Sequence, residues 1–235
     1  MIMKELVTAF AACAAAGLAL AQVESNIVGY VNTQGANGAT VFSPMFVACG
    51  GGNATLGDIT GDFTEYSDTL QILDETLTTS TMYSWIDVTY SAITPVWTSD
   101  GSTDDSAVVI PRGAGVVISS SAAVILNAGE VETTDVVISC DMGATVLGNP
   151  TPVTITLGDI TFSGLQEWDD SIQLLDPTLS TAEIYTWIDV TYGSNDPVWS
   201  SDGVADDSST ILAPGAGFVL SCANNGVTVT FPSAL

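Results

Sequence analysis

Short runs of apolar and β-branched residues, separated by Gly, Asn, Asp, Ser and Pro, recur along most of the chain. Residues 116–119, 123–126 and 227–231 are the clearest of these runs. Such runs between turn formers predict β-strands. Only residues 68–76 and 170–178 favour a helical turn or two. Strands spaced about ten residues apart predict an all-β fold, built from β-sandwiches or partly closed barrels.

The pattern occurs twice. Residues 55–60, Thr-Leu-Gly-Asp-Ile-Thr, return unchanged as residues 156–161. Residues 83–90 return as residues 185–192, with Tyr-x-Trp-Ile-Asp-Val-Thr-Tyr in both places. Self-similarity at a fixed spacing indicates two copies of one unit.

The boundary between the copies is placed by an upstream alignment. We match residues 26–30 with residues 135–139, so the boundary falls near residues 132–134. We therefore expect two tandem homologous β modules, packed closely together, over residues 22–133 and 134–235.

The N-terminal residues have the pattern of an export signal. Lys4 precedes an apolar run over residues 6–20, and Ala19-Leu20-Ala21 is typical of a cleavage site. The run is shorter than the roughly 20 residues that a membrane span needs, and no later stretch reaches that length. A lipid anchor at Cys13 is less favoured, because Cys13 lies inside the run. Residues 1–21 are predicted to be a cleaved signal peptide, and the protein to be secreted, extracellular or at the cell surface.

Charge restricts the classes of partner. The chain has two basic residues, Lys4 and Arg112, against 27 acidic ones, and its formal net charge is −25. Such a field opposes binding to nucleic acid or anionic lipid. Apolar residues still make up 46% of the chain, which favours a packed core under an acidic surface. Contacts between copies should need salt or divalent cations to screen the carboxylates.

Residue types that serve catalysis are scarce. The chain has no histidine, so Ser-His-Asp and Cys-His arrangements are impossible, and the mature chain has no lysine for a Schiff base. A carboxylate pair could cleave a glycosidic bond, but pairs arise easily in so acidic a chain. We expect a protein that is not an enzyme.

Two Asp-rich loops are the candidate metal sites, with calcium as the candidate ion. Residues 100–105 read Asp-Gly-Ser-Thr-Asp-Asp, and residues 202–207 read Asp-Gly-Val-Ala-Asp-Asp. Calcium takes roughly six to eight oxygens, which carboxylates and loop carbonyls can supply. The spacing is not that of an EF-hand, and Asp-Gly is typical of a simple turn, which we favour. The candidate ligands are Asp100, Asp104, Asp105, Asp202, Asp206 and Asp207.

Tryptophans and tyrosines occupy matching places in the two copies. Exposed aromatic faces would stack on sugar rings, whereas large aromatics in strands more often belong to the core. We favour the core, because Tyr83 and Trp85 alternate onto one face of a predicted strand. The set comprises Trp85, Trp97, Trp187, Trp199, Tyr83, Tyr90, Tyr185 and Tyr192.

Two further patterns are interpreted as structural. Removal of the signal leaves Cys49, Cys140 and Cys222, so at most one internal disulfide can form; its pairing is open, and buried free thiols are favoured. Residues 113–115 and 215–217 both read Gly-Ala-Gly, but no lysine follows as in a phosphate loop. We expect a tight turn into a strand at each.

The order of motifs carries a resemblance. Val-Gly-Tyr-Val-Asn at residues 28–32 is followed by Leu-x-Asp-Ile, Tyr-x-Trp-x-Asp, a later Trp and, at residues 214–218, Pro-Gly-x-Gly-Phe. In this order the chain resembles secreted, internally duplicated β proteins of planctomycete and verrucomicrobial bacteria. The resemblance covers nearly all of the mature chain and implies export and duplication, but no active site. The first copy departs from it at residues 111–113, Pro-Arg-Gly, where the second has Ala-Pro-Gly.

These features predict an extracellular structural protein that self-associates into a filament, fibre or surface array. The alternative is a secreted glycan- or ligand-binding module that uses calcium. The expected partners are further copies of the chain, with glycan as the alternative. A strand-like N-terminal segment is the candidate assembly element, because it could pair with a neighbour's sheet edge. It comprises Ile27, Val28, Gly29, Tyr30, Val31 and Asn32.

Overall fold

A computed structural model describes residues 28–34, 37–47, 52–73, 80–89, 94–121, 124–175, 182–191, 193 and 196–234. These residues form β-strands and two short 3-10 helices, and no α-helix. The all-β prediction is therefore confirmed. No sheet among the described strands closes into a barrel. None of the described segments is a helix with the length and apolar character needed to cross a membrane.

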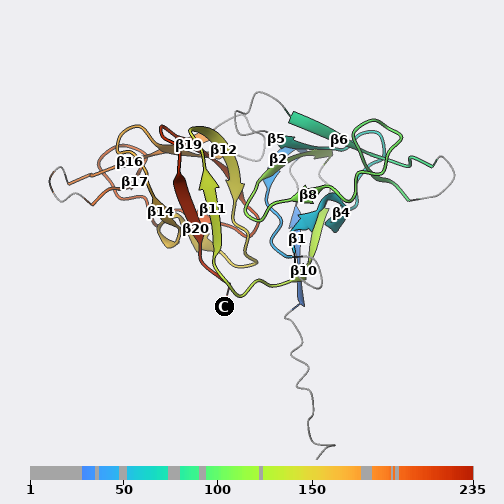
Figure 1. Ribbon diagram of the computed structural model, residues 1–235, viewed down its shortest axis with the longest axis horizontal. Helices are drawn as coiled ribbons and strands as arrows, with labels where there is room; N and C mark the ends of the chain where they lie inside the picture. Colours follow the sequence, from blue (N-terminus) through green and yellow to red (C-terminus); the bar gives the residue numbers. More distant parts are fainter. Residues whose placement is uncertain are drawn as a thin grey trace, which may run out of the picture.

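The first half of the structure, residues 28–130, contains a five-stranded and a three-stranded sheet (Figure 1). Its strands are β1 (Val28–Gln34), β2 (Asn37–Phe42), β3 (Ala54–Thr55), β4 (Ile59–Gly61), β5 (Thr69–Leu73), β6 (Ser80–Ile86), β7 (Val96–Thr98), β8 (Val109–Ile110), β9 (Val116–Ser121) and β10 (Val124–Glu130), with the 3-10 helix η1 (Leu56–Asp58) after β3. The larger sheet has the order β2-β9-β5-β6-β7 and the smaller one β1-β10-β4, while β3 pairs with β8.

The second half, residues 136–231, has the same arrangement. Its strands are β11 (Val136–Cys140), β12 (Gly143–Gly148), β13 (Ile155–Thr156), β14 (Thr161–Ser163), β15 (Ser171–Leu175), β16 (Ala182–Ile188), β17 (Val198–Ser200), β18 (Ile211–Leu212), β19 (Gly217–Cys222) and β20 (Val227–Phe231), with η2 (Leu157–Asp159) after β13. The sheet orders are β12-β19-β15-β16-β17, β11-β20-β14 and β13-β18. Figure 1 shows the two halves side by side along the long axis of the molecule.

Each half has its own apolar core between its two larger sheets. In the first half, Leu70 and Ile118 of the five-stranded sheet pack in one cluster with Ile59 and Ile125 of the three-stranded sheet. All four side chains are almost fully buried. Strand alternation explains this, because every second residue of a strand points to the same face. A corresponding cluster fills the second half.

The halves meet through contacts that occur twice with their roles exchanged. Phe42 forms a bridge to Ala216, and Leu147 forms the matching bridge to Ala114. The N–H of Ser43 donates to the carbonyl of Gly215 at 2.9 Å, and that of Gly148 to the carbonyl of Gly113 at 3.0 Å. A further cluster joins β2 and β9 to β12 and β19, through Val41, Val117, Val146 and Val219. This reciprocity is that of an approximate two-fold axis between the halves.

The two predicted helical turns are wrong. Residues 69–73 and 171–175 form β5 and β15, each in the middle of a five-stranded sheet. Leu70 pairs with Tyr83 on one side and with Ile118 on the other. Hydrogen bonding to two neighbouring strands therefore overrides the weak local preference for a turn. Residues 74–79 and 176–181 lie outside the described residues.

The alignment of residues 26–30 with residues 135–139 is also wrong. Asn32 pairs with Leu126, which pairs with Thr60; Val137 pairs with Thr230, which pairs with Thr161. Because Thr60 and Thr161 occupy the same place in the repeated motif, Asn32 corresponds to Val137. The offset is thus 105 residues rather than 109, and β1 begins earlier in the unit than β11 does.

Candidate functional site

The first Asp-rich loop is held by its own carboxylates. Gly101 has a φ of 75°, which suits glycine in a turn. Asp100 Oδ1 accepts the N–H groups of Ser102 at 2.8 Å and Thr103 at 2.7 Å. Both donors stabilise the charged form, so the pKa of Asp100 lies well below its ordinary value. Asp105 Oδ2 accepts both the N–H and the hydroxyl of Ser99 at 2.7 Å.

The second loop repeats this arrangement. Asp202 Oδ1 accepts the N–H groups of Val204 and Ala205 at 2.8 and 2.9 Å. These hydrogen bonds lower the pKa of Asp202, and the bond from Ala205 has the largest effect. Asp207 binds Ser201 as Asp105 binds Ser99. Asp104 and Asp206 each accept the N–H two residues further on. In both loops the carboxylates thus accept backbone N–H groups of the loop itself.

No group of three or more acidic, cysteine or histidine side chains in the described part of the chain is placed to hold a metal ion. Calcium binding by Asp100, Asp104, Asp105, Asp202, Asp206 and Asp207 stays a prediction.

The matching tryptophans belong to the core. Trp97 and Trp199 are 0% and 1% exposed. The half-buried Trp85 and Trp187 pack on them, with ring centroids 5.0 Å apart in each pair. Tyr83 and Tyr185 are also buried, which confirms the core interpretation for these side chains; Tyr90 and Tyr192 lie outside the described residues. A sugar platform made of Trp97 and Trp199 would therefore need the core to open.

Two aromatic residues that the sequence reasoning missed are exposed. Tyr66 is 66% and Trp168 58% exposed, and they lie 102 residues apart, at matching places in the two halves. Both have left-handed backbones, with φ values of 62° and 73°, and they are the only described non-glycine residues with positive φ. A bulky side chain is uncommon in this conformation. The sequence does contain a sign of this exposure. An aromatic residue lies in each of two otherwise polar segments, Thr-Glu-Tyr-Ser-Asp and Gln-Glu-Trp-Asp-Asp.

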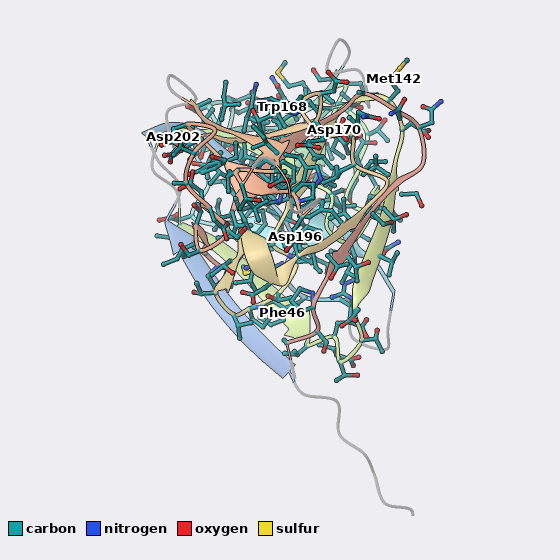
Figure 2. All side chains as sticks on the ribbon, turned by 90° about the vertical axis from the view of Figure 1, so that its left-hand side faces the viewer. Phe46, Met142, Trp168, Asp170, Asp196 and Asp202 are labelled. Carbon is teal, nitrogen blue, oxygen red and sulfur yellow. The ribbon has the colours of Figure 1, made fainter. Side chains whose placement is uncertain are left out.

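A buried aspartate holds each of these aromatic turns, defined as residues 64–68 and 166–170. Asp170 is 0% exposed. Its Oδ2 accepts the N–H of Gln166 at 2.6 Å, which closes the turn, and its Oδ1 accepts the N–H of Ala223 at 2.6 Å, just beyond β19. The N–H of Trp168 donates to the carbonyl of Trp187 at 2.9 Å. Figure 2 shows Trp168 and Asp170 close together in the second half.

The first aromatic turn is built in the same way. Asp68 accepts the N–H of Thr64 at 2.8 Å and that of Ser121 at 3.4 Å, and the N–H of Tyr66 donates to the carbonyl of Trp85 at 3.0 Å. Beside this turn lies a shallow hollow of about 430 Å³. Its lining comprises Gly38, Ala39, Ser67, Asp68, Ser119, Ser120 and Ser121.

The cysteines and the Gly-Ala-Gly segments agree with their structural interpretations. Cys140 and Cys222 are buried and form no disulfide, and burial raises the pKa of Cys222 to about 12; Cys49 lies outside the described residues. The N–H of Ala114 donates to the carbonyl of Pro111 at 3.0 Å, and Gly113 has a φ of 74°. This is the tight turn expected before β9, and its counterpart precedes β19.

The candidate assembly segment forms most of an edge strand. Residues 28–32 belong to β1, which pairs along its length with β10. No other described strand pairs with the opposite edge of β1. Ile27 lies outside the described residues.

No protein-family model, no curated protein and no solved structure matches the chain.

Proposed function

We propose that the protein is an exported, non-catalytic structural protein whose copies associate into a filament or array through the edge strand β1. In this proposal residues 1–21 are a signal peptide, and the two halves are β-sandwich modules that arose by duplication. The observation that carries the proposal is the outer edge of β1, which no described strand covers. An edge strand presents a row of N–H and C=O groups that can pair with another chain.

The second half offers a second edge. β11 is the end strand of the sheet β11-β20-β14, just as β1 is of the sheet β1-β10-β4. A molecule with one edge can only dimerise, whereas a molecule with two edges can extend a chain of subunits. Pairing of β1 with β11 of the next copy would be head-to-tail contact, the kind that generates a filament.

Charge would regulate this association. Two copies that each have a formal net charge of −25 repel one another. Salt or divalent cations would screen or bridge the carboxylates, so assembly should depend on ionic conditions.

Two adjacent prolines test the proposal. Successive N–H groups along a strand point to opposite edges, so one of Val31→Pro and Asn32→Pro removes only an outer N–H, and the other removes a bond to β10. Electron micrographs of the mature protein, with and without calcium, should show filaments. One proline variant should remain monomeric with an unchanged melting temperature. Wild-type protein that stays monomeric in every buffer, or filaments that persist in both variants, would refute the proposal.

A further inference from the structure

We propose that Tyr66 and Trp168, at matching positions in the two halves, are platforms on which the rings of a neutral glycan stack. The proposal does not depend on filament formation. It rests on the backbone of the aromatic turns, on the exposure of the two rings and on the charge around them.

The backbone conformation is the first observation. A left-handed backbone costs a non-glycine residue about 1–2 kcal/mol, yet an aromatic side chain occupies this conformation in both halves. In each turn, hydrogen bonds to a buried aspartate and to the carbonyl of Trp85 or Trp187 maintain the conformation. Glycine would fit the same turn without strain.

Exposure is the second observation. A strained core residue is compensated by the burial of its side chain, but Tyr66 and Trp168 leave most of their surface in water. Most of each ring is therefore open to a ligand. Strain at a residue whose side chain is largely exposed points to a function of that side chain.

The surroundings determine the class of ligand. A flat aromatic face accepts the apolar C–H face of a sugar ring, while nearby acceptors bind its hydroxyls. Glu167 and Asp169 flank Trp168, and the serine-lined hollow begins next to Tyr66 at Ser67. The strongly acidic chain disfavours sulfated or uronic acid polymers. A neutral sugar fits both the rings and the charge.

The two platforms differ in detail. Ser120 and Ser121 of the first half correspond to Cys222 and Ala223 of the second, so hydroxyl groups are fewer beside Trp168. We expect the two sites to prefer different positions on one glycan chain. Two sites in one molecule would also hold an insoluble polymer more strongly than a short oligosaccharide, because binding at the first site makes the second intramolecular.

Glycine variants separate binding from folding. Tyr66→Gly, Trp168→Gly and the double variant should keep or slightly raise the melting temperature, because they relieve strain. On an array of neutral oligosaccharides the wild type should bind. Each single variant should then bind one equivalent of a responding sugar in place of two and lose at least about tenfold in retention on the insoluble polymer. The double variant should not bind.

Two controls make the result specific. Met82→Ser and Ile184→Ser remove exposed apolar side chains at another matching pair of positions and should bind as wild type does. Trp168→Asn, which also tolerates a left-handed backbone, should lose binding as Trp168→Gly does. Addition of a sugar that binds on the array should change the fluorescence of Trp168, the one exposed tryptophan among the described residues.

Three outcomes would overturn the inference. The first is an array on which no neutral glycan binds the wild type. The second is a double glycine variant that binds as tightly as the wild type. The third is selective binding of choline-type quaternary ammonium ligands, which would assign the rings to cation recognition.

Discussion

Glycines determine how closely the two halves approach. A Cβ on Gly115 would lie 2.6 Å from Val146 Cγ1, and a Cβ on Gly217 would lie still closer to Val41 Cγ1. Gly115 and Gly217 are matching residues, and so are Val41 and Val146. The second glycine of each Gly-Ala-Gly segment is therefore required by contact between the halves, whereas the first provides the positive φ of a turn.

Alanine at either glycine should destabilise the fold. We expect Gly115→Ala and Gly217→Ala each to lower the free energy of unfolding by about 1–3 kcal/mol, because the added methyl group overpacks the interface. Urea denaturation followed by fluorescence measures this change. Gly193→Ala is the matched control, since a Cβ there meets no atom within 4 Å. Equal stability of all three variants would contradict the contact.

The loop aspartates should make stability depend on acid pH. Hydrogen bonds hold the pKa values of Asp100 and Asp202 below the ordinary value of 3.8. A carboxyl group with a depressed folded-state pKa stabilises the fold above its unfolded pKa, and this contribution is lost as pH falls through the folded pKa. The melting temperature should therefore decrease as the pH is lowered below about 4. The double variant Asp100→Asn/Asp202→Asn should have a lower melting temperature than the wild type at neutral pH and should lose less of it on acidification. A pH profile identical to that of the wild type would argue against these hydrogen bonds.

The aromatic turns show how an element can depend on one buried side chain. Both carboxylate oxygens of Asp170 accept backbone N–H groups, one from its own turn and one from the segment after β19. The residue therefore connects the turn to a strand end far away in the sequence. Asp68 has the same two roles in the first half.

Asparagine should not replace this aspartate. In Asp170→Asn an NH2 group would face one of the two N–H donors, so one donor would lose its partner at a buried position. We expect a loss of about 1–3 kcal/mol in the free energy of unfolding. The neighbouring Asp169 is exposed, and Asp169→Asn should be close to neutral. Similar melting temperatures for both variants would mean that the turn does not rely on the carboxylate.

The sequence predicts strands better than it predicts their partners. Runs such as residues 116–119 fall within β9 because alternation and β-branched residues act locally. The residues of β5 favour a helical turn by themselves, and they form a strand because they pair with β6 and β9. The sequence alignment of β1 with β11 is wrong because the two similar apolar runs match at more than one offset. Only the pairing of the strands in the sheets identifies the correct offset.

Candidate sites follow the same division. The Asp-Gly turns could be predicted because their hydrogen bonds lie within a few residues. Residue type alone could not distinguish Tyr66 and Trp168 from the aromatic residues of the core. Their exposure depends on a positive φ that is maintained by Asp68 and Asp170, and by the carbonyl groups of Trp85 in β6 and Trp187 in β16.

The whole molecule resembles a symmetric dimer within one chain. The bridges and the backbone hydrogen bonds from Ser43 and Gly148 between the halves are counterparts with the roles exchanged, and the valine cluster contributes two matching pairs. Such an interface is self-complementary. A single half would therefore present a surface suited to another copy of itself.

A fragment of residues 134–235 should form a homodimer. Gly217 of one copy would then contact Val146 of the other copy. In the intact chain, the matching residue Gly115 makes this contact with Val146. Light scattering after size exclusion, at a salt concentration that screens the acidic surface, would measure the mass. Val146→Asp in the same fragment should stay monomeric, because it buries a carboxylate in the valine cluster. A monomeric wild-type fragment that is folded by circular dichroism would contradict this prediction.

The tight turn before β9 places Arg112 at the position that Pro214 occupies in the other half. The Arg112 guanidinium lies 2.9 Å from Glu132, in the segment that connects the halves, and its side chain is only 15% exposed. Without the predicted signal peptide, Arg112 is the one residue after which trypsin can cut. A protease needs an extended, accessible chain, so the folded turn protects this bond. The rate of tryptic cleavage therefore reports how often this turn opens, and a single cut there would divide the chain into two fragments of readily distinguished mass.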